Sequence, residues 1–314
     1  MSGVFPGCRD LDAFWRNLNE GKDLITRAPD ERWYFSAESL KPGSRAAQFE
    51  APWGGFIPDL DKFDPLFFDI SPREAELMDP QQRLFLQTVW HTLEDAGYKK
   101  SDFAGTKTGI FAGVAANDYA NLLGTQGVAV EAYSATGNAH SVLANRVSYF
   151  FDLRGPSEAI DTACSSSLVA IHRAIESIAS GTSEMAIAGG VNVLLSPGAF
   201  LAFGKAGMLC EDGRCKTFDV RANGYVRGEG VGAILLKPLS RARQDGDHIY
   251  ALILGSGENH GGHVQSLTVP NPNAQAQLLE DVYARAGIDP FTISYIEAHG
   301  TGTASNGPSN VTDG

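Results

Sequence analysis

The stretch DTACSSSLVAIHRAIESIASG, residues 161–181, decides the fold. Its apolar residues recur three and four positions apart from Leu168 to Ile178, the pattern of one face of an amphipathic helix. Serines ahead of this helix can cap its free N–H groups, and Gly181 can end it. Residues 156–160 precede it and are typical of a short strand. The sequence therefore predicts a strand–turn–helix unit with Cys164 on the turn.

Cys164 is a candidate nucleophile because of this position. The N-terminus of a helix carries partial positive charge, which favours thiolate over thiol and lowers the pKa of a cysteine. A nucleophilic thiol needs that setting. A buried structural cysteine beside small serines fits this stretch equally well, so the stretch alone leaves both interpretations open.

A second motif, YIEAHGTGT at residues 295–303, favours the nucleophile. It is predicted to be a strand that runs into a glycine-rich turn presenting His299. A lone histidine after a strand is more often structural, but a cysteine and a histidine far apart in sequence can meet in a fold. Gly300 and Gly302 also allow a close backbone approach, which suits a ligand site.

Composition excludes several classes of function. The chain has 314 residues, of which 43% are hydrophobic and 20% charged, as in a protein able to bury a core. Its formal net charge of −12 argues against nucleic acid as a partner. Four cysteines do not make a disulfide framework in a chain of this length. The N-terminus lacks an apolar signal core, and the longest apolar run, 186–195, is too short to span a bilayer. We expect a cytoplasmic protein.

The periodicity along the chain predicts an α/β protein. Asp79 and Pro80 are a strong helix start, as N-cap and first helical residue. Residues 33–58 are expected to form a packed loop region. Several predicted strands are apolar throughout and alternate with helices, which favours a largely parallel sheet. We expect helices at 10–18, 79–96, 138–151 and 274–286, and further strands at 108–114, 185–195, 232–238, 249–255 and 293–298.

Other polar clusters have plainer interpretations. A basic run between residues 205 and 227 is expected to pair internally with nearby acids, although it could also form a rim for an acidic carrier protein. The spacings of Cys210 with Cys215 and of His260 with His263 lack the partners of a zinc site. No metal site is predicted. The run's basic residues are Lys205, Arg214, Lys216, Arg221 and Arg227, and the acids are Glu211, Asp212, Asp219 and Glu229.

DTACSSSLVA together with EAHGTGT resembles the β-ketoacyl synthase domains of modular polyketide synthases. The resemblance runs from about residue 3 to residue 303 and includes FDPLFFDISPREAELMDPQQRLFL and GRCKTFDVRANGYVRGEGVGAILLKPLSRA. NHGGHVQSLTVPNPNAQAQLL is most similar to members whose acyltransferase is a separate protein. The family implies a thiolase-like fold of two similar halves in five αβαβα layers. Here the nucleophile half would be about 1–240, the incomplete C-terminal half about 241–303, and an atypical tail 304–314.

The resemblance also implies a chemistry. Cys164 would accept an acyl chain from a carrier-protein thioester and pass it to a malonyl-carrier thioester that loses CO₂. His299 would hydrogen-bond the malonyl thioester oxygen, and Thr301 and Thr303 would hold the phosphopantetheine arm. No metal or organic cofactor is implied. The expected partners are an acyl carrier protein and a second copy of the chain, paired through residues 156–160.

The chain departs from the family at both ends. It begins inside a GMSG-like turn, so we expect the first strand, predicted to be central in the sheet, to be missing. After Thr303 it differs from the family's Gly-Asp-Pro segment, and the second catalytic histidine, a lysine and a glycine–phenylalanine loop are not found. This predicts an aggregation-prone chain with weak self-acylation and no condensation.

Three alternatives remain open from the sequence. One is a catalytically incomplete carrier-binding or dimerisation module, and another is a thiolase-like acyl transferase that uses free coenzyme A. The third is a cysteine hydrolase, although no acidic partner that could orient His299 is evident near its motif.

Overall fold

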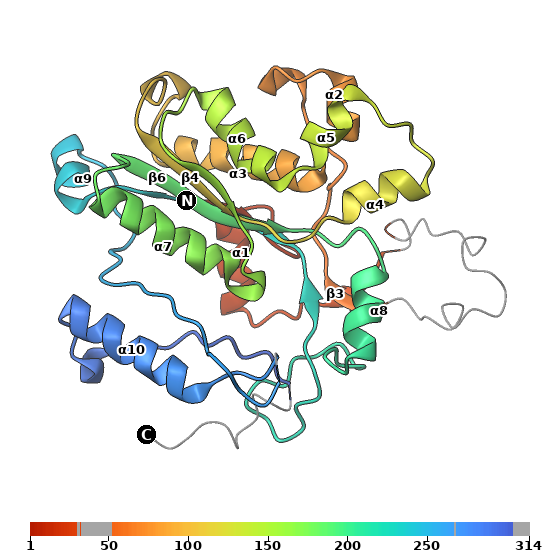
Figure 1. The fold of residues 1–314 in the computed structure, drawn as a ribbon, viewed down its shortest axis with the longest axis vertical. Helices are drawn as coiled ribbons and strands as arrows, with labels where there is room; N and C mark the ends of the chain where they lie inside the picture. The colour runs from red at the N-terminus through yellow and green to blue at the C-terminus, as the bar shows by residue number, and fades with distance from the viewer. Residues whose placement is uncertain (30–31, 33–51, 267, 304–314) are drawn as a thin grey trace. The chain divides into compact units, whose positions relative to one another are not determined.

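The structure is a computed structural model that describes residues 1–29, 32, 52–266 and 268–303. It divides into two compact units (Figure 1). The first contains residues 1–199 and 227–248, and the second contains 200–226 and the described residues from 249 onward. The predicted loop at 33–58 lies largely outside the described residues.

A five-stranded sheet forms the centre of the first unit, in the order β1-β8-β6-β4-β5. β4, β5 and β6 run parallel, and β8 is antiparallel to both of its neighbours. The strands predicted at 108–114, 156–160, 185–195 and 232–238 are thereby confirmed, with small shifts at their ends. The strands are β1 (Ser2–Val4), β4 (Thr108–Gly113), β5 (Ser157–Ile160), β6 (Met185–Asn192) and β8 (Gly230–Leu236).

The expectation of a missing first strand is wrong. Ser2–Val4 pairs antiparallel with β8, and Gly3 lies opposite Gly232. This strand is at the edge of the sheet, where only one side needs hydrogen-bonding partners, so three residues are enough to form it.

Helices cover both faces of this sheet, with α3 (Pro80–Asp95) and α6 (His140–Phe151) on one face and α7 (Ser166–Ala179) on the other (Figure 1). Successive residues of β4 point to opposite faces, as a strand requires. Ile110 belongs to the large core under α3 and α6, whereas Phe111 packs with the small core of α7. The first unit is thus an αβα sandwich.

The predicted start of α3 is confirmed. The carboxylate of Asp79 accepts a hydrogen bond from the backbone N–H of Gln81 at 2.8 Å, and Pro80 is the first helical residue. Phe85 in this helix is fully buried and packs in one core with Phe151 of α6. Burial of a phenylalanine side chain stabilises a fold by about 1.5–3 kcal/mol.

Shorter elements complete the first unit. β2, β3 and β7 form a second, three-stranded sheet. The shorter elements are α1 (Leu11–Asn19), β2 (Thr26–Arg27), β3 (Trp53–Gly55), η3 (Leu66–Phe68), α2 (Pro72–Leu77), η4 (Lys100–Asp102), α4 (Asp118–Thr125), α5 (Ala132–Asn138), β7 (Arg227–Gly228) and α9 (Leu239–Asp245). A further helix, α8 (Gly198–Lys205), belongs to the second unit from residue 200 onward.

The second unit contains the predicted C-terminal helix, α10 (Pro272–Ala286), and a short helix, η6 (Pro290–Thr292). The side chain of Asn271 caps α10, and Gly287, with φ +64°, ends it. The strands predicted at 249–255 and 293–298 are not formed. Their apolar side chains are largely exposed, Leu254 by 68% and Ile296 by 73%. A strand needs a neighbour for its backbone groups, and the described residues around these segments provide none.

Candidate functional site

The turn that carries Cys164 has the predicted form. β5 ends at Ile160, a single 3₁₀ turn, η5, covers Ala163–Ser165, and α7 begins at Ser166. Cys164 is exposed and carries a free thiol. The residue before it, Ala163, has φ +55°. A left-handed conformation costs a non-glycine residue about 1–2 kcal/mol, so the surrounding structure must hold it in place.

Hydroxyl groups hold this turn. Ser166 Oγ accepts a hydrogen bond from the backbone N–H of Thr162 at 2.9 Å and donates one to the carbonyl of Ala163 at 2.7 Å. Ser165 Oγ donates to the carbonyl of Thr162 at 2.9 Å, and the carboxylate of Asp161 accepts from the N–H of Ala163 at 3.0 Å. The serines follow Cys164 in sequence and bond to the backbone of the two residues before it, Thr162 and Ala163, which fixes the turn at the positive end of α7.

Small side chains let α7 lie close to the sheet. Ala170 and Ala174 are fully buried against Phe111 of β4 and the alanines of β6. Leu168, by contrast, is 72% exposed. The apolar periodicity predicted the helix correctly, but the most buried side chains are alanines, and Ile171 and Ile178 of the predicted face are only partly buried against the same core.

His299, Thr301 and Thr303 lie on one turn of the second unit. His299 is exposed, and Thr301 and Thr303 are half-buried, with their hydroxyl oxygens 3.3 Å apart. Gly300 and Gly302 have φ +51° and +70°, conformations that glycine adopts without strain. The predicted glycine turn is therefore present, although no strand leads into it.

A loop that contains Thr217 and Gly224 holds this turn in place, a contact that was not predicted from the sequence. Thr217 Oγ1 donates to the carbonyl of Gly300 at 2.5 Å, and the N–H of Gly224 donates to the carbonyl of Gly302 at 3.0 Å. A Cβ on Gly302 would lie 2.9 Å from the backbone nitrogen of Lys216. The glycines signalled a close approach, but not which segment approaches.

His299, Thr301 and Thr303 lie together in the second unit, whereas Cys164 belongs to the first unit. The pairing of Cys164 with His299 stays a prediction.

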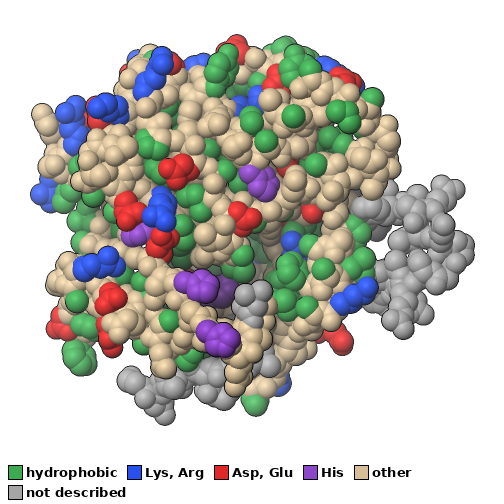
Figure 2. Space-filling view, viewed as in Figure 1, with side chains coloured by type: hydrophobic (Ala, Val, Ile, Leu, Met, Phe, Trp, Pro, Cys, Tyr) green, Lys and Arg blue, Asp and Glu red, His purple; other side chains and the backbone are tan. Residues whose placement is uncertain are grey.

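The basic run pairs internally in part. Lys216 Nζ lies 2.8 Å from Asp212, and Arg221 lies 2.7 Å from Asp219. Glu229 departs from the prediction, because its partner is Arg32, at 3.2 Å. Lysine and arginine side chains are interspersed with acidic ones on the face shown in Figure 2.

Glu229 is a buried structural group in the first unit. Besides Arg32, it accepts hydrogen bonds from the backbone N–H groups of Ile57 at 2.9 Å and Leu194 at 3.0 Å. Burial raises the pKa of the Glu229 carboxyl, against the opposing charge of Arg32.

Neither a metal centre nor a membrane span is observed in the described part of the chain. Its histidine, cysteine and acidic side chains form no group of three or more that could hold a metal ion. None of its helices has the length and apolar character needed to cross a bilayer. The four cysteines are free thiols.

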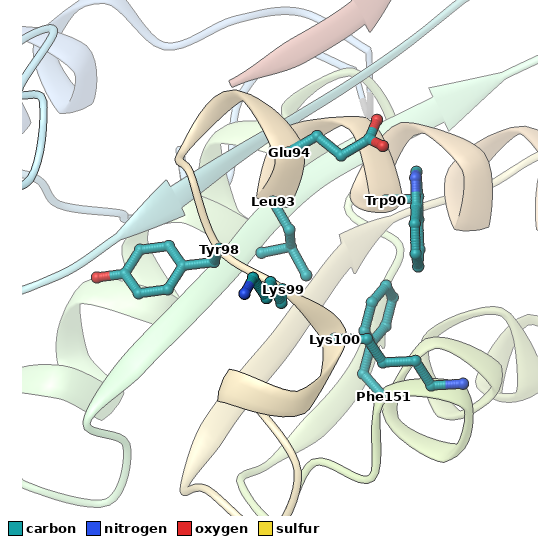
Figure 3. Close-up of a pocket in the computed structure, with 7 residues that line it drawn as sticks. All are labelled: Trp90, Leu93, Glu94, Tyr98, Lys99, Lys100 and Phe151. Atoms are coloured by element: carbon teal, nitrogen blue, oxygen red, sulfur yellow. The ribbon is translucent and has the colours of Figure 1, made fainter.

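A surface pocket lies on the α3 and α6 side of the first unit, and the rings of Trp90 and Phe151 stack in it with centroids 6.0 Å apart (Figure 3). α7 covers the opposite face of the sheet, so this pocket is separate from the Cys164 turn. The residues that line it are Trp90, Leu93, Glu94, Tyr98, Lys99, Lys100 and Phe151.

Comparison with known families identifies the two motifs. Residues 1–242 match the sequence model of the β-ketoacyl synthase N-terminal domain, and residues 250–312 match that of its C-terminal domain. The chain belongs to the β-ketoacyl synthase family. The two segments that carry Cys164 and His299 fall in the N-terminal and C-terminal matches, respectively.

Relatives of this chain are polyketide synthases. Polyketide synthase PksN of Bacillus subtilis is 51% identical over 311 residues, which are 99% of this chain and 6% of the relative. Polyketide synthase ThaG of Burkholderia thailandensis is 47% identical over 97% of this chain and 5% of its own length. The chain therefore spans a small part of each of these relatives.

Solved structures show the same fold. The ketosynthase from module 6 of the Bacillus subtilis bacillaene synthase superposes with a TM-score of 0.86 at 41% identity, covering 96% of this chain and 50% of that one. The OzmH KS7 ketosynthase domain of Streptomyces albus gives 0.87 at 44% identity, covering 96% and 52%. The predicted thiolase-like α/β fold is confirmed.

Proposed function

We propose that this chain acts as a β-ketoacyl-[acyl carrier protein] synthase in polyketide assembly. The observation that carries the proposal is the exposed Cys164 thiol, held by Thr162, Ser165 and Ser166 on a fixed turn at the positive end of α7. A nucleophile in acyl transfer needs access to substrate, a fixed position and a nearby positive potential, and this turn offers all three.

In the first half-reaction, the Cys164 thiolate attacks the carbonyl carbon of an acyl thioester on the phosphopantetheine of a carrier protein. A carbon–sulfur bond forms to Cys164, the bond to the pantetheine sulfur breaks, and the carrier leaves as its thiolate, which takes a proton from water. Backbone N–H groups at the start of α7 are placed to stabilise the oxyanion of the tetrahedral intermediate.

In the second half-reaction, a malonyl-carrier thioester loses CO₂, and the electron pair of the broken bond forms an enolate. The enolate carbon attacks the acyl group on Cys164, a carbon–carbon bond forms, and the Cys164 thiolate is released. His299 would donate a hydrogen bond to the enolate oxygen, and Thr301 and Thr303 would bond to the amides of the pantetheine arm. Their place on one turn supports this division of roles. The mechanism needs no metal or organic cofactor.

The proposed partners are an acyl carrier protein, which delivers the pantetheine arm, and a second copy of the chain. β5 supports the dimer because it is an edge strand of the sheet. Two antiparallel copies of β5 would form an isologous interface. We also propose a cytoplasmic location. The proposed division of the chain is a nucleophile half at about 1–240, an incomplete C-terminal half at about 241–303 and a tail at 304–314.

Mass spectrometry tests the function. After incubation with an acyl-carrier thioester, the intact chain should gain one acyl group, which a peptide map should place on Cys164, and Cys164→Ala should gain none. With malonyl carrier added, the sequence predicts no β-ketoacyl-carrier product from the 314-residue chain. A product would overturn that prediction, and His299→Ala should then keep acylation but lose the product.

Other outcomes separate the alternatives. Binding of the carrier without acylation would identify a carrier-binding module. Acylation by a coenzyme A thioester but not by the carrier thioester would identify a thiolase-like transferase. Hydrolysis of the thioester without a lasting adduct would identify a hydrolase.

A further inference from the structure

Two glycines lie beneath the first turn of α7. Gly113 is the last residue of β4, and Gly190 of β6 is its neighbour in the parallel ladder. A Cβ on Gly113 would lie 2.8 Å from the backbone nitrogen of Ser167 and 2.9 Å from the carbonyl carbon of Ser166. A Cβ on Gly190 would overlap Ser167 Oγ and lie 3.3 Å from Ser167 Cβ.

Backbone conformation does not explain these glycines. Neither has a positive φ, so other residues could adopt the same strand geometry. Glycine weakens a strand interior because it adds backbone entropy and packs no side chain. The close approach of α7 is the remaining reason for glycine at both positions, which lie side by side under the helix terminus.

We propose that Gly113 and Gly190 are positioning residues for Cys164, because their missing side chains let the backbone of Ser166 and Ser167 rest on the sheet. Ser166 transmits that position, since its hydroxyl bonds to both Thr162 and Ala163. A helix start lifted from the sheet would carry Cys164 with it. The inference deepens the proposed function and rests on it.

The two glycines make different contacts, and this gives an asymmetric test. The shortest contact of the methyl group added in Gly190→Ala is with the hydroxyl of Ser167, which Ser167→Ala removes; looser contacts remain with the carbonyl oxygen of Gly113 at 3.1 Å and with the Cβ of residue 167 at 3.3 Å. The shortest contacts of the methyl group added in Gly113→Ala are with backbone atoms of Ser167 and Ser166, which no side-chain change removes. Ser167→Ala should therefore restore most of what Gly190→Ala loses but not what Gly113→Ala loses, with Ser167→Ala alone as the reference for both double variants.

Gly109→Ala is the matched control. Gly109 lies in the same strand and also lacks a positive φ, and its added Cβ would lie 2.8 Å from Phe111 Cε2 and Ser183 Oγ. The crowding is similar, but the affected side chains contact α7 beyond its start, because Phe111 packs with Ala170 and Ala174 and Ser183 Oγ lies 2.6 Å from Ser177 Oγ. Gly109→Ala should lower the melting temperature without changing the rate at which Cys164 is acylated.

Two readouts report on the position of Cys164. The first is single-turnover acylation of the 314-residue chain by an acyl-carrier thioester, followed by mass spectrometry. Gly113→Ala should lower the rate at saturating carrier by roughly 10–100-fold, with little change in the half-saturating carrier concentration, because misplacement affects the chemical step. The second is hydrogen exchange of amides 170–173, which close the first turns of α7 and should exchange roughly tenfold faster.

Each result either supports or contradicts the proposal that the two glycines position Cys164. Slower acylation and faster exchange in Gly113→Ala, the rescue of Gly190→Ala alone, and an unaffected Gly109→Ala would support the proposal. Wild-type acylation and exchange in Gly113→Ala would overturn it, as would equal effects of Gly109→Ala or an identical response of both glycine variants to Ser167→Ala. If the wild-type chain is never acylated, the proposed function is refuted. Amide exchange in the glycine variants would then still test whether the two glycines position the start of α7.

Discussion

Cys164 is positioned by hydroxyl groups and small residues rather than by apolar packing of its own side chain. Ser166 is buried and bonds to the backbone of Thr162 and Ala163, the two residues before the nucleophile, whereas Ser165 is exposed. The sequence showed which residue stands at the helix start. It could not show the left-handed Ala163 or the hydrogen bonds that hold it, because these depend on contacts within the folded turn.

Ser166→Ala should destabilise the protein. It removes the two hydrogen bonds by which Ser166 holds the N–H of Thr162 and the carbonyl of Ala163, and a hydrogen bond contributes about 0.5–1.5 kcal/mol to stability. Ser165→Ala is the control, since water can replace its exposed hydrogen bond. Urea unfolding should show a lower midpoint for Ser166→Ala only, and equal midpoints for the two variants would contradict this account of the turn.

The four thiols should differ in their access to reagent. Cys164 is exposed, whereas Cys8 and Cys210 are buried, and burial also raises the pKa of the Cys210 thiol. Cys215 is exposed, but its sulfur accepts a hydrogen bond from the N–H of Val226 at 3.2 Å. Iodoacetamide at neutral pH should therefore label Cys164 first in the folded chain. Peptide mapping over time measures the order, and early labelling of Cys8 would show that the first unit opens under these conditions.

At the scale of elements, helices were predicted better than strands. The helix at 274–286 is confirmed because a helix satisfies its own backbone, so a local sequence pattern contains most of the information. The segments 249–255 and 293–298 have equally clear apolar patterns but form no strands. A strand depends on a neighbour elsewhere in the chain, and periodicity does not report whether that neighbour is present.

An ion cluster links the two ends of α9 to Tyr98, which follows the end of α3. Lys237 Nζ lies 2.7 Å from Asp245, 2.5 Å from Asp247 and 2.7 Å from the hydroxyl of Tyr98. Hydrogen bonds from Lys237 and then Arg241 lower the pKa of the Asp245 carboxyl. Because the folded pKa is below the unfolded value, this group stabilises the fold above the unfolded pKa, about 3.9, and the contribution disappears as the pH falls through the lower folded value.

Asp245→Asn tests this pH dependence. At neutral pH the variant should melt at a lower temperature than the wild type, because Lys237 and Arg241 lose a charged partner. The difference should begin to shrink near pH 4, where the carboxyl group of the unfolded chain becomes protonated, and should disappear as the pH falls through the lower pKa of the folded carboxyl group. Thermal melts between neutral pH and pH 3 measure it, with Asp12→Asn, in the first turn of α1, as a surface control. A difference that does not change with pH would refute the electrostatic explanation.

At the scale of the whole molecule, the α/β class followed from periodicity, but the complete order of elements and their layered arrangement did not. The thiolase-like fold was expected only through the family resemblance, since no internal repeat is visible in the sequence. Edge and centre positions in a sheet are set by long-range pairing, which explains why β1 was expected to be a missing central strand and is an edge strand instead.

The edge position of β5 leads to a prediction about assembly. The carbonyls of Pro156 and Ile160 accept hydrogen bonds from β4, so by alternation the N–H of Ala159 points to the free edge. Ala159→Pro removes that donor while the ladder with β4 keeps its bonds, and Ala159→Val adds similar bulk but keeps the donor. Sedimentation at micromolar concentration should show a dimer for the wild type and Ala159→Val, and a folded monomer for Ala159→Pro. A monomeric wild type, or a dimer that survives Ala159→Pro with an unchanged melt, would place the interface elsewhere or remove it.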